Sequence, residues 1–206
     1  MDAAAAPVIP GRECGTCTLC CKVYHVPEIN KVAGKWCGHC NPGKGCSIHE
    51  ALPAQCAAFN CLWRTEETLA PAWKPERAKM VVSVFPQNGF IYVQVDPGAP
   101  QAWRRQPYYD QLRRWAAAHL PRGRHVIVFV NDVATLIMPD QDVPLGAMNP
   151  ADGFSVRQTS GPRGMTYEVN RTSRSPRTPL GVTGQGRSGQ LGAKSQNVTA
   201  KPLLGH

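Results

Sequence analysis

All nine cysteines of this 206-residue chain lie in one short stretch near its beginning, and the last 145 residues contain none. Four of them fall within the eight residues CGTCTLCC, which begin at Cys14. The chain shows no export signal, and in a reducing compartment clustered thiols are more often metal ligands or redox groups than disulfides. We therefore predict metal binding, with these candidate ligands: Cys14, Cys17, Cys20, Cys21, Cys37, Cys40, Cys46, Cys56 and Cys61.

The spacing of the cysteines is compatible with two kinds of metal centre. CGTC and CGHC each separate two thiols by two residues, and the 19 residues between these motifs are near the usual spacing of a four-cysteine zinc site. CGTCTLC also matches the run that holds three irons of a 4Fe–4S cluster. Because neighbouring side chains diverge, the adjacent Cys20 and Cys21 favour two separate sites. The spacing therefore permits either zinc or iron as the bound metal, with the iron in an iron–sulfur cluster.

The histidines are weaker candidates for ligands. His25, His39 and His49 lie among the cysteines, but soft metals prefer sulfur and sulfur is already plentiful. We expect these three side chains to be solvated or to lie outside the ligand set. His119 and His125 are expected to be structural.

The cysteine stretch resembles a known family. CGTCTLCC is followed by WCGHC, GCSIH, LPAQC and FNCLW, and together they are similar to the bacterial cysteine-cluster proteins with a zinc- or iron-chelating domain (the CxxCxxCC or YkgJ type). The resemblance covers residues 11–63, and some later motifs, among them MVVSV and VDPGAPQAWRRQPYY, are similar to one longer branch. It implies metal chelation by these cysteines. A branch of the same superfamily includes flagellin lysine methylases, which implies methyl transfer as an alternative activity.

Composition and charge narrow the remaining classes of protein. The chain has 42% hydrophobic residues but no run of 18 or more apolar residues, so we expect a core and no membrane partner. Together with the missing export signal, this predicts a cytoplasmic protein. Of the formal charge of +9, residues 1–150 carry +3 (15 Lys/Arg, 12 Asp/Glu) and residues 151–206 carry +6 (8 and 2). The end of the chain is therefore a candidate for weak contact with nucleic acid.

The chain divides into four segments of different composition. The cysteine-rich segment shows no sustained period of 3.6 or 2, and a bound metal would replace the core that so short a piece lacks. From residue 171 the chain is rich in Gly, Ser, Thr and Pro, which predicts disorder. The predicted organisation is a flexible N-terminus at 1–10, a cysteine-cluster module at 11–75, a small α+β region at 76–170 and a disordered basic tail at 171–206.

Alternation and turn signals predict the strands of the α+β region. Residues 78–95 are predicted to form a hairpin that turns at Pro86-Gln-Asn-Gly89, because Asn-Gly favours tight turns. HVIVFVND and ATLIMP predict a second hairpin that turns near Asn131 and Asp132. RGMTYEV, at 163–169, is a candidate last strand.

One main helix is predicted over residues 107–120. Tyr108, Leu112, Trp115 and His119 fall on one face of that helix, whereas Arg113 and Arg114 lie away from it and are expected to face water. The fold class is therefore α+β: a small metal-stabilised cysteine-rich module packed on an antiparallel sheet with one main helix, followed by a disordered C-terminal tail.

Three functions follow from these patterns. The first is a metal-binding protein that chelates zinc or iron, with a protein partner of unknown identity. The second is an iron–sulfur enzyme of redox or methyl-transfer type, so whether the chain is an enzyme stays open. The third is a zinc-type nucleic-acid-binding module, in which the basic tail would contribute most of the binding. Arg104, Arg105, Arg113 and Arg114 with the neighbouring aromatic residues could form a further patch, but we expect these arginines to face water. Trp36, Trp63 and Trp73 are expected to cover the cysteines or to join them to the sheet.

Overall fold

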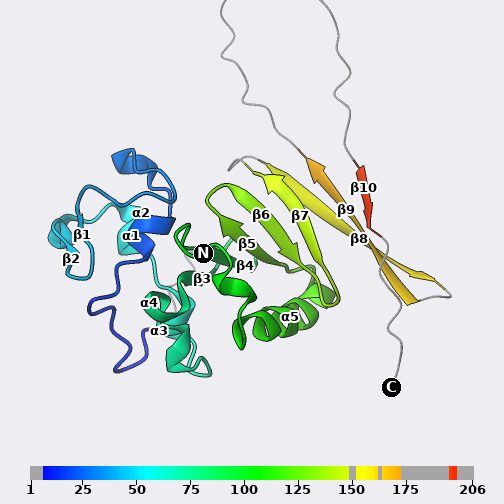
Figure 1. Cartoon of the computed structure of the whole chain (residues 1–206), viewed down its shortest axis with the longest axis horizontal. Coiled ribbons are helices and arrows are strands. Elements are labelled where there is room, and N and C mark those ends of the chain that lie inside the picture. The colour runs from blue at the N-terminus through cyan, green and yellow to red at the C-terminus, as the bar shows by residue number, and fades with distance from the viewer. Residues whose placement is uncertain (1–6, 149–151, 162–163, 173–194, 199–206) are drawn as a thin grey trace, which may run out of the picture. The chain divides into compact units, whose positions relative to one another are not determined.

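The computed structural model describes residues 7–148, 152–161, 164–172 and 195–198. The chain divides into two compact units, Met1–Gly146 and Ala147–His206 (Figure 1). The cysteine-rich segment and the main sheet both belong to the first unit. The predicted boundary at residue 75 therefore falls inside one compact body. Of the predicted flexible N-terminus, residues 1–6 lie outside the described residues.

Five strands form the main sheet of the first unit, in the order β3-β4-β5-β6-β7. β3 (Met80–Val84) pairs antiparallel with β4 (Ile91–Val95), and β5 (Val126–Val130) pairs antiparallel with β6 (Val133–Ile137). β7 (Asp142–Ala147) lies beside β6 at the edge of the sheet. Both predicted hairpins are confirmed.

The sheet is mixed, and the prediction of an antiparallel sheet is wrong for one pair of strands. β4 and β5 run parallel, with Val93 opposite Val128. Between them the chain passes through η4 (Ala102–Arg104), α5 (Tyr108–His119) and η5 (Leu120–Arg122). This crossover brings the chain back to the end of the sheet at which β4 starts. The next strand, β5, can therefore run in the same direction as β4.

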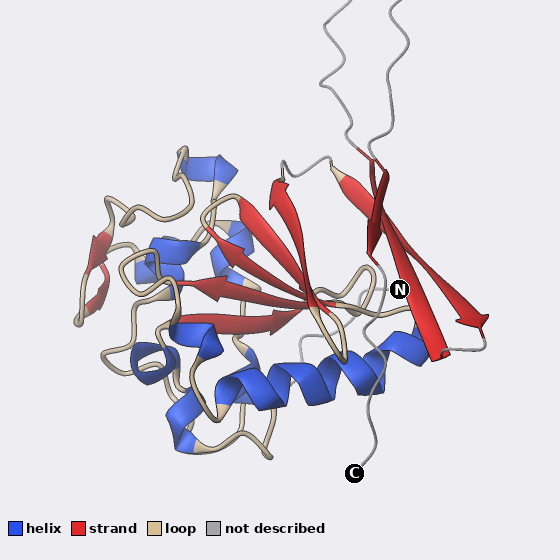
Figure 2. Cartoon of the chain, turned by 45° about the vertical axis from the view of Figure 1, so that its right-hand side comes forward, coloured by secondary structure: helices blue, strands red, loops and turns tan. Residues whose placement is uncertain are grey.

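The helix α5 runs along one face of the sheet (Figure 2). Its Leu112 is fully buried in the main core, and Tyr108 and Trp115 pack against the same core. The ring of Trp73 lies 4.9 Å from that of Tyr108 and 5.2 Å from that of Trp115. The predicted apolar face is therefore confirmed at these positions, and His119 at its end is half-buried.

The cysteine-rich segment consists of short pieces, as its lack of periodicity predicts. No helix or strand between residues 7 and 78 is longer than four residues. Figure 1 shows these pieces, coloured blue to green, gathered on one side of the sheet. They are α1 (Cys20–Val23), η1 (Pro27–Ile29), β1 (Cys40–Asn41), β2 (Gly45–Cys46), η2 (His49–Ala51), α2 (Ala54–Ala57), α3 (Leu62–Thr65), η3 (Pro71–Trp73) and α4 (Pro75–Ala78).

Strand β3 joins the cysteine-rich segment to the sheet, because successive side chains of a strand point to opposite faces. Met80 and Val82 belong to the core that includes Leu112 of α5. Val81 points the other way, into a smaller core with Leu19, Val23 and Cys61. The part of the segment that carries Leu19, Val23 and Cys61 thus packs on the face of the sheet opposite to α5, whereas its later residues Leu69 and Trp73 join the core beneath α5.

The second unit contains a three-stranded antiparallel sheet in the order β10-β9-β8. β9 (Gly164–Thr172) covers the predicted last strand, whereas β8 (Gly153–Gly161) and its hairpin with β9 were not predicted. The end of β9 and β10 (Ser195–Val198) are strands within the tail that was expected to be disordered. The rest of that tail, 173–194 and 199–206, lies outside the described residues.

Candidate metal centre

Three of the predicted ligands line one small cavity. Cys14, Cys17 and Cys61, which we call the N-terminal thiol group, surround a cavity of about 10 Å³. That volume is about the space of a single water-sized sphere. The wall of the cavity is completed by Trp63, Arg64, Lys74 and Pro75. Residues that are 44 positions apart in the sequence, Cys17 and Cys61, therefore meet at one place.

Arg12 fixes the chain just before the first cysteine. Its guanidinium group donates four hydrogen bonds of 2.7–2.8 Å to backbone carbonyl groups at and beyond α3, the short helix that follows Cys61. One positive group thus satisfies carbonyls that a helix end leaves without partners. The acceptors are the carbonyls of Trp63, Glu66, Glu67 and Leu69.

Backbone N–H groups around the N-terminal thiol group donate hydrogen bonds to its sulfur atoms. The pKa of the Cys61 thiol is raised to about 11, mainly by burial, and the two other thiols of the group add to this. The backbone N–H of Arg64 opposes the shift by a hydrogen bond to Cys61. Burial also raises the pKa of Cys17, against hydrogen bonds from the backbone N–H groups of Leu19 and Glu76. N–H groups aimed at sulfur are the usual surroundings of metal-bound thiolates.

A second set of thiols interacts around the β1–β2 hairpin, and we call it the central thiol group. Cys40 lies directly opposite Cys46 in the hairpin. The backbone N–H of Cys37 donates to the carbonyl of Cys21 at 3.0 Å, which ties α1 to the CGHC motif. After burial, the negative charges of Cys21, Cys37 and Cys46 each raise the pKa of Cys56, so these thiols lie close to it. The members are Cys21, Cys37, Cys40, Cys46 and Cys56.

Burial and mutual repulsion disfavour ionised thiols in this group. The pKa of Cys40 is raised to about 11, first by burial and then by the thiolate of Cys21, whereas the hydroxyl of Thr18 lowers it by a hydrogen bond. The backbone N–H of His39 donates to the sulfur of Cys37 at 3.4 Å. Several thiolates could ionise together here only if a positive charge were added.

Lys31 supplies positive charge beside the central thiol group, and it was not predicted from the sequence. Its side chain is buried, and its ammonium group donates hydrogen bonds to the carbonyls of Lys22, at 2.7 Å, and of Tyr24. Burial lowers the pKa of Lys31, but the thiolates of the group, with Cys37 first, oppose that shift. A buried ammonium group next to several sulfurs favours negative charge on them.

Glu28 holds the short helix that carries Cys56. Its carboxylate accepts hydrogen bonds from the backbone N–H groups of Ala54, at 2.9 Å, and Gln55, at 3.2 Å, at the start of α2. These groups have no partner within the helix. The side chain of Gln55 also donates to the carbonyl of His25 at 2.7 Å. No sequence motif indicated this role, because Glu28 lies 26 residues before the helix.

Cys20 lies between the two groups. Its thiol forms a hydrogen bond with that of Cys21, and this bond, ahead of burial, raises the pKa of Cys21. Cys20 also packs with Cys17 against the small core that contains Cys61. The described contacts thus connect Cys20 with both groups.

The thiols gather without forming a complete metal cage. Among the described residues, no three or more His, Cys, Asp or Glu side chains have the arrangement that holds a metal ion. The CGTC and CGHC motifs fall into different groups, so the structure does not bring them together as a single four-cysteine zinc site. His25, His39 and His49 are exposed, in agreement with their expected solvated state.

The three tryptophans differ in their surroundings. Trp63 lines the cavity of the N-terminal thiol group, and Trp73 lies in the main core, so these two fit the expected roles. Trp36 is 43% exposed, and the ammonium group of Lys22 lies 5.5 Å from its ring. Trp36 borders a hollow of about 250 Å³ whose wall includes Cys37. The central thiol group therefore has an accessible side.

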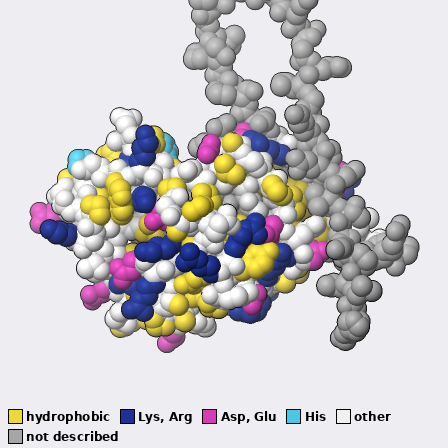
Figure 3. Space-filling view, viewed as in Figure 1, with side chains coloured by type: hydrophobic (Ala, Val, Ile, Leu, Met, Phe, Trp, Pro, Cys, Tyr) yellow, Lys and Arg dark blue, Asp and Glu magenta, His cyan; other side chains and the backbone are white. Residues whose placement is uncertain are grey.

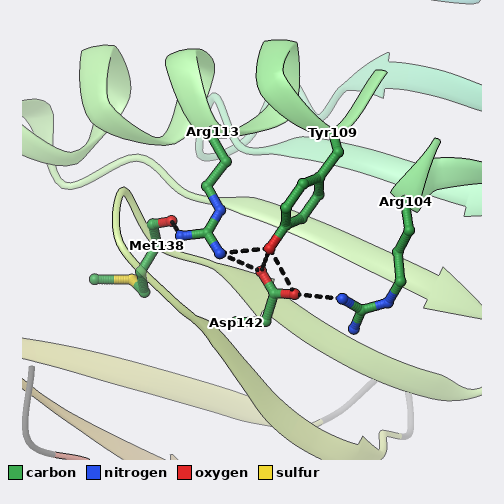
Figure 4. A network of polar contacts seen from close by, with 5 residues as sticks. All are labelled: Arg104, Tyr109, Arg113, Met138 and Asp142. Atoms are coloured by element: carbon green, nitrogen blue, oxygen red, sulfur yellow. Dashed lines mark hydrogen bonds and ion pairs between the residues drawn. The ribbon is translucent and has the colours of Figure 1, made fainter. Parts of the chain in front are cut away.

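The arginines near α5 are engaged in a network centred on Asp142 (Figure 4). Asp142 pairs with Arg104 at 2.8 Å and with Arg113 at 3.4 Å, and it accepts hydrogen bonds from the hydroxyl of Tyr109 at 3.0 Å. Arg113 also donates to the carbonyl of Met138 at 3.2 Å. The expectation that Arg113 faces water is therefore wrong: it links α5 to the sheet.

The surface does not favour the nucleic-acid patch. On the face shown in Figure 3, Lys and Arg side chains are interspersed with Asp and Glu rather than forming one basic field. Two arginines of the proposed patch, Arg104 and Arg113, are paired with Asp142. Their charges are thus partly neutralised within the protein.

Comparison of the chain with family models, curated proteins and solved structures gave no match. The resemblance of residues 11–63 to the cysteine-cluster proteins therefore stays a prediction. Within the residues that the structure describes, none of the helices has the length and apolar character needed to span a bilayer.

Proposed function

We propose that this protein binds metal through its cysteines, in two places. The observation that carries the proposal is the division of eight thiols into the N-terminal and central thiol groups, each drawn from segments far apart in the chain. The metal is zinc or iron, an iron–sulfur centre included, because sulfur ligands suit both. All nine cysteines are free thiols in the structure, which fits a reducing compartment such as the cytoplasm.

The donors around each group support a bound cation. Backbone N–H groups point at Cys17, Cys37 and Cys61, as they do at metal thiolates. Crowded thiolates repel one another, and a metal ion would remove that repulsion. Arg64 acts on Cys61 of the first group and Lys31 lies beside the second, so each would offset part of the negative charge of a metal–thiolate centre.

The energetics also favour a metal. The cysteine-rich segment buries few large side chains, and the small core that it shares with β3 contains Leu19, Val23, Cys61 and Val81. Binding of structural zinc contributes about 10–16 kcal/mol in small peptides, as much as the whole stability of a typical domain, about 5–15 kcal/mol. We expect the segment to depend on its metal and the five-stranded sheet to persist without it.

An iron–sulfur enzyme of redox or methyl-transfer type is the second candidate. The observation that favours it is the hollow of about 250 Å³ beside Cys37, which would let a small molecule approach the central thiol group. A purely structural zinc site needs no such access.

The deciding experiment uses the full chain, purified without oxygen. We would measure zinc, iron and acid-labile sulfide per chain and record the ultraviolet–visible spectrum. Zinc without sulfide would indicate zinc sites, whereas matching iron and sulfide with visible absorbance would indicate a cluster and strengthen the enzyme candidate.

One cysteine variant in each thiol group tests whether that group binds metal. We expect Cys17→Ser and Cys37→Ser each to lower the metal content, and Lys44→Gln, on the exposed β1–β2 turn, to leave it unchanged. Hydrogen exchange after chelation should increase in residues 11–63 and change little in β3–β6. A chain that binds neither metal, with exchange unchanged by chelators, would refute the proposal.

A further inference from the structure

The backbone of the CGHC motif brings its two cysteines close together. The backbone N–H of Cys40 donates a hydrogen bond to the carbonyl of Cys37 at 3.1 Å, which closes a tight turn. The Cα atoms at the two ends of such a turn are less than about 7 Å apart. A disulfide needs Cα atoms about 4.4–6.8 Å apart, so this turn is compatible with a bond between Cys37 and Cys40.

Cys37 is the accessible cysteine of this pair. It lines the hollow of about 250 Å³, whereas Cys40 is not among the described residues that line it. The thiol of Cys40 instead forms hydrogen bonds with the hydroxyl of Thr18 and with the thiol of Cys21. A small molecule that enters the hollow therefore meets Cys37 first.

The surroundings of Cys37 favour negative charge on its sulfur. The backbone N–H of His39 donates to this sulfur at 3.4 Å. Burial lowers the pKa of Lys31, and among the thiols that oppose this shift Cys37 contributes most, so the ammonium group lies near its sulfur. The thiolate is the nucleophile of disulfide exchange, and C-x-x-C motifs are common places for proteins to stabilise it.

The CGTC motif closes the same kind of turn but lacks this combination. The backbone N–H of Cys17 donates to the carbonyl of Cys14 at 2.9 Å. Cys14 is the exposed member, whereas the backbone N–H groups of Leu19 and Glu76 are directed at Cys17. The cavity beside these two thiols, about 10 Å³, has room for one water-sized sphere. In CGHC, by contrast, access and stabilisation fall on the same sulfur.

The hollow indicates the class of reaction partner. Its described lining includes Lys31 and Lys35 and no acidic residue, and its apolar surface comes in part from the exposed side chains of Val32 and Trp36. Sites for small ligands have volumes of about 300–1,000 Å³, so a hollow of about 250 Å³ suits a small molecule or part of one. The positive charge favours a partner that carries carboxylate groups.

We infer that the CGHC motif is a redox-active dithiol that exchanges with a small, negatively charged disulfide. This activity goes beyond the proposed metal binding, and a metal held by Cys37 and Cys40 would block it. First, the thiolate of Cys37 attacks one sulfur of the small disulfide, whose S–S bond breaks and releases one thiol. The thiolate of Cys40 then attacks the sulfur of Cys37 in the mixed disulfide and releases the second thiol. The protein gives up two electrons and two protons, and the two released thiols carry them away.

The test uses the full chain, reduced and kept without oxygen in the presence of a chelator, with oxidised glutathione as the probe. After an acid quench, free thiols are alkylated and the tryptic fragments are analysed by mass spectrometry. The fragment that contains Cys37 and Cys40 contains no other cysteine. We expect a disulfide within this fragment to form at least about tenfold faster than in the same chain unfolded in urea, and ahead of a bond between Cys14 and Cys17.

Two cysteine variants separate the roles of the sulfurs. Cys40→Ser should stop at a mixed disulfide between Cys37 and glutathione, because the sulfur that releases the second thiol is missing. Cys37→Ser should leave Cys40 largely unmodified over the same time, because Cys40 does not line the hollow.

Charge variants test the class of the partner. Lys35→Glu should slow the reaction with oxidised glutathione about threefold and accelerate the reaction with cystamine, a positively charged disulfide, by a similar factor. Arg114→Glu changes an exposed residue of α5 that does not line the hollow, and it should alter neither rate. Equal effects of Lys35→Glu on both probes would overturn the assignment of an anionic partner.

Three results would overturn the dithiol itself. A first disulfide that joins Cys40 to Cys21 or to Cys46 would make another pair the reactive one. Equal rates in buffer and in urea would show that the folded turn and the hollow contribute nothing. Faster modification of Cys40 in Cys37→Ser than of Cys37 in Cys40→Ser would reverse the two roles. Because the chelator keeps metal out, none of these outcomes depends on whether the chain binds zinc or iron.

Discussion

Cys40 lies directly opposite Cys46 across the two-residue ladder of β1 and β2. Residues opposite one another in antiparallel strands have Cβ atoms about 4.5–5.5 Å apart, on the same face. The backbone alone therefore brings two sulfurs together before a metal arrives. This arrangement depends on Gly43 in the turn and on Gly45 at the start of β2, which have φ angles of +75° and +131°.

The first prediction concerns that turn. Gly45→Ala should lower the metal affinity of the central thiol group about tenfold, because an alanine at this φ is strained by about 1–3 kcal/mol. The measurement is competition for zinc with a chelating dye. Gly38→Ala is the control, since neither a positive φ nor a close neighbour restricts Gly38. Equal affinities of the two variants would contradict the role of the turn.

The second prediction concerns Arg12, which donates to four carbonyl groups. Arg12→Lys should reduce the free energy of unfolding by about 2–3 kcal/mol, because one ammonium group cannot reach all four acceptors and partly buried carbonyls would lose their donors. Urea denaturation measures the change. Arg114→Lys should cost less than about 0.5 kcal/mol, since Arg114 is exposed and pairs with Gln111. Equal losses in both variants would argue against this function of Arg12.

The third prediction concerns the link between α5 and the sheet. Asp142→Asn should destabilise the first unit by about 1–3 kcal/mol, because the half-buried Arg113 would keep its charge and lose its carboxylate partner. Thermal unfolding provides the measurement, with the exposed Asp140→Asn as control. Unfolding of Asp142→Asn at the same temperature as the control would show that the network adds no stability.

The fourth prediction concerns pH. Burial lowers the pKa of His125 below its ordinary value of about 6.5. In acid the unfolded chain therefore takes up a proton that the folded chain resists, so stability falls as the pH drops below about 6.5. His125→Gln should make the free energy of unfolding less dependent on pH between about 6.5 and 5, whereas the exposed His39→Gln should not. An unchanged pH dependence in His125→Gln would contradict this assignment.

Much of the fold follows from local patterns in the sequence. Alternation and turn residues predicted the β3–β4 and β5–β6 hairpins, and helical spacing predicted α5 with its buried Leu112. The parallel pairing of β4 with β5 was missed because strand direction depends on the path of the whole crossover, which no short window contains. The β8–β9 hairpin was missed because residues 153–161 lack the regular alternation of apolar residues.

The site was predictable in composition but not in arrangement. Nine clustered cysteines indicated metal, yet their spacing suggested that CGTC and CGHC would share a site, and the structure assigns them to different groups. Cys61 joins Cys14 and Cys17 through packing against β3. Trp63, which was expected near the cysteines, lines the cavity of the N-terminal thiol group, whereas Lys31 beside the central thiol group was missed because a lone lysine carries no sequence signal.

The alternation of β3 has a consequence for how this protein can change over evolutionary time. Val81 rests against the cysteine-rich segment while Met80 and Val82 rest against the core beneath α5. We therefore expect the segment to fold poorly if transplanted alone, because one of the four buried residues of its small core, Val81, belongs to a strand that begins after it ends. A shift of β3 by one residue would exchange the two faces and disturb the thiols and the helix together. Substitutions in β3 are therefore expected to affect the cysteines and the helix together, although the two parts of the chain differ in composition.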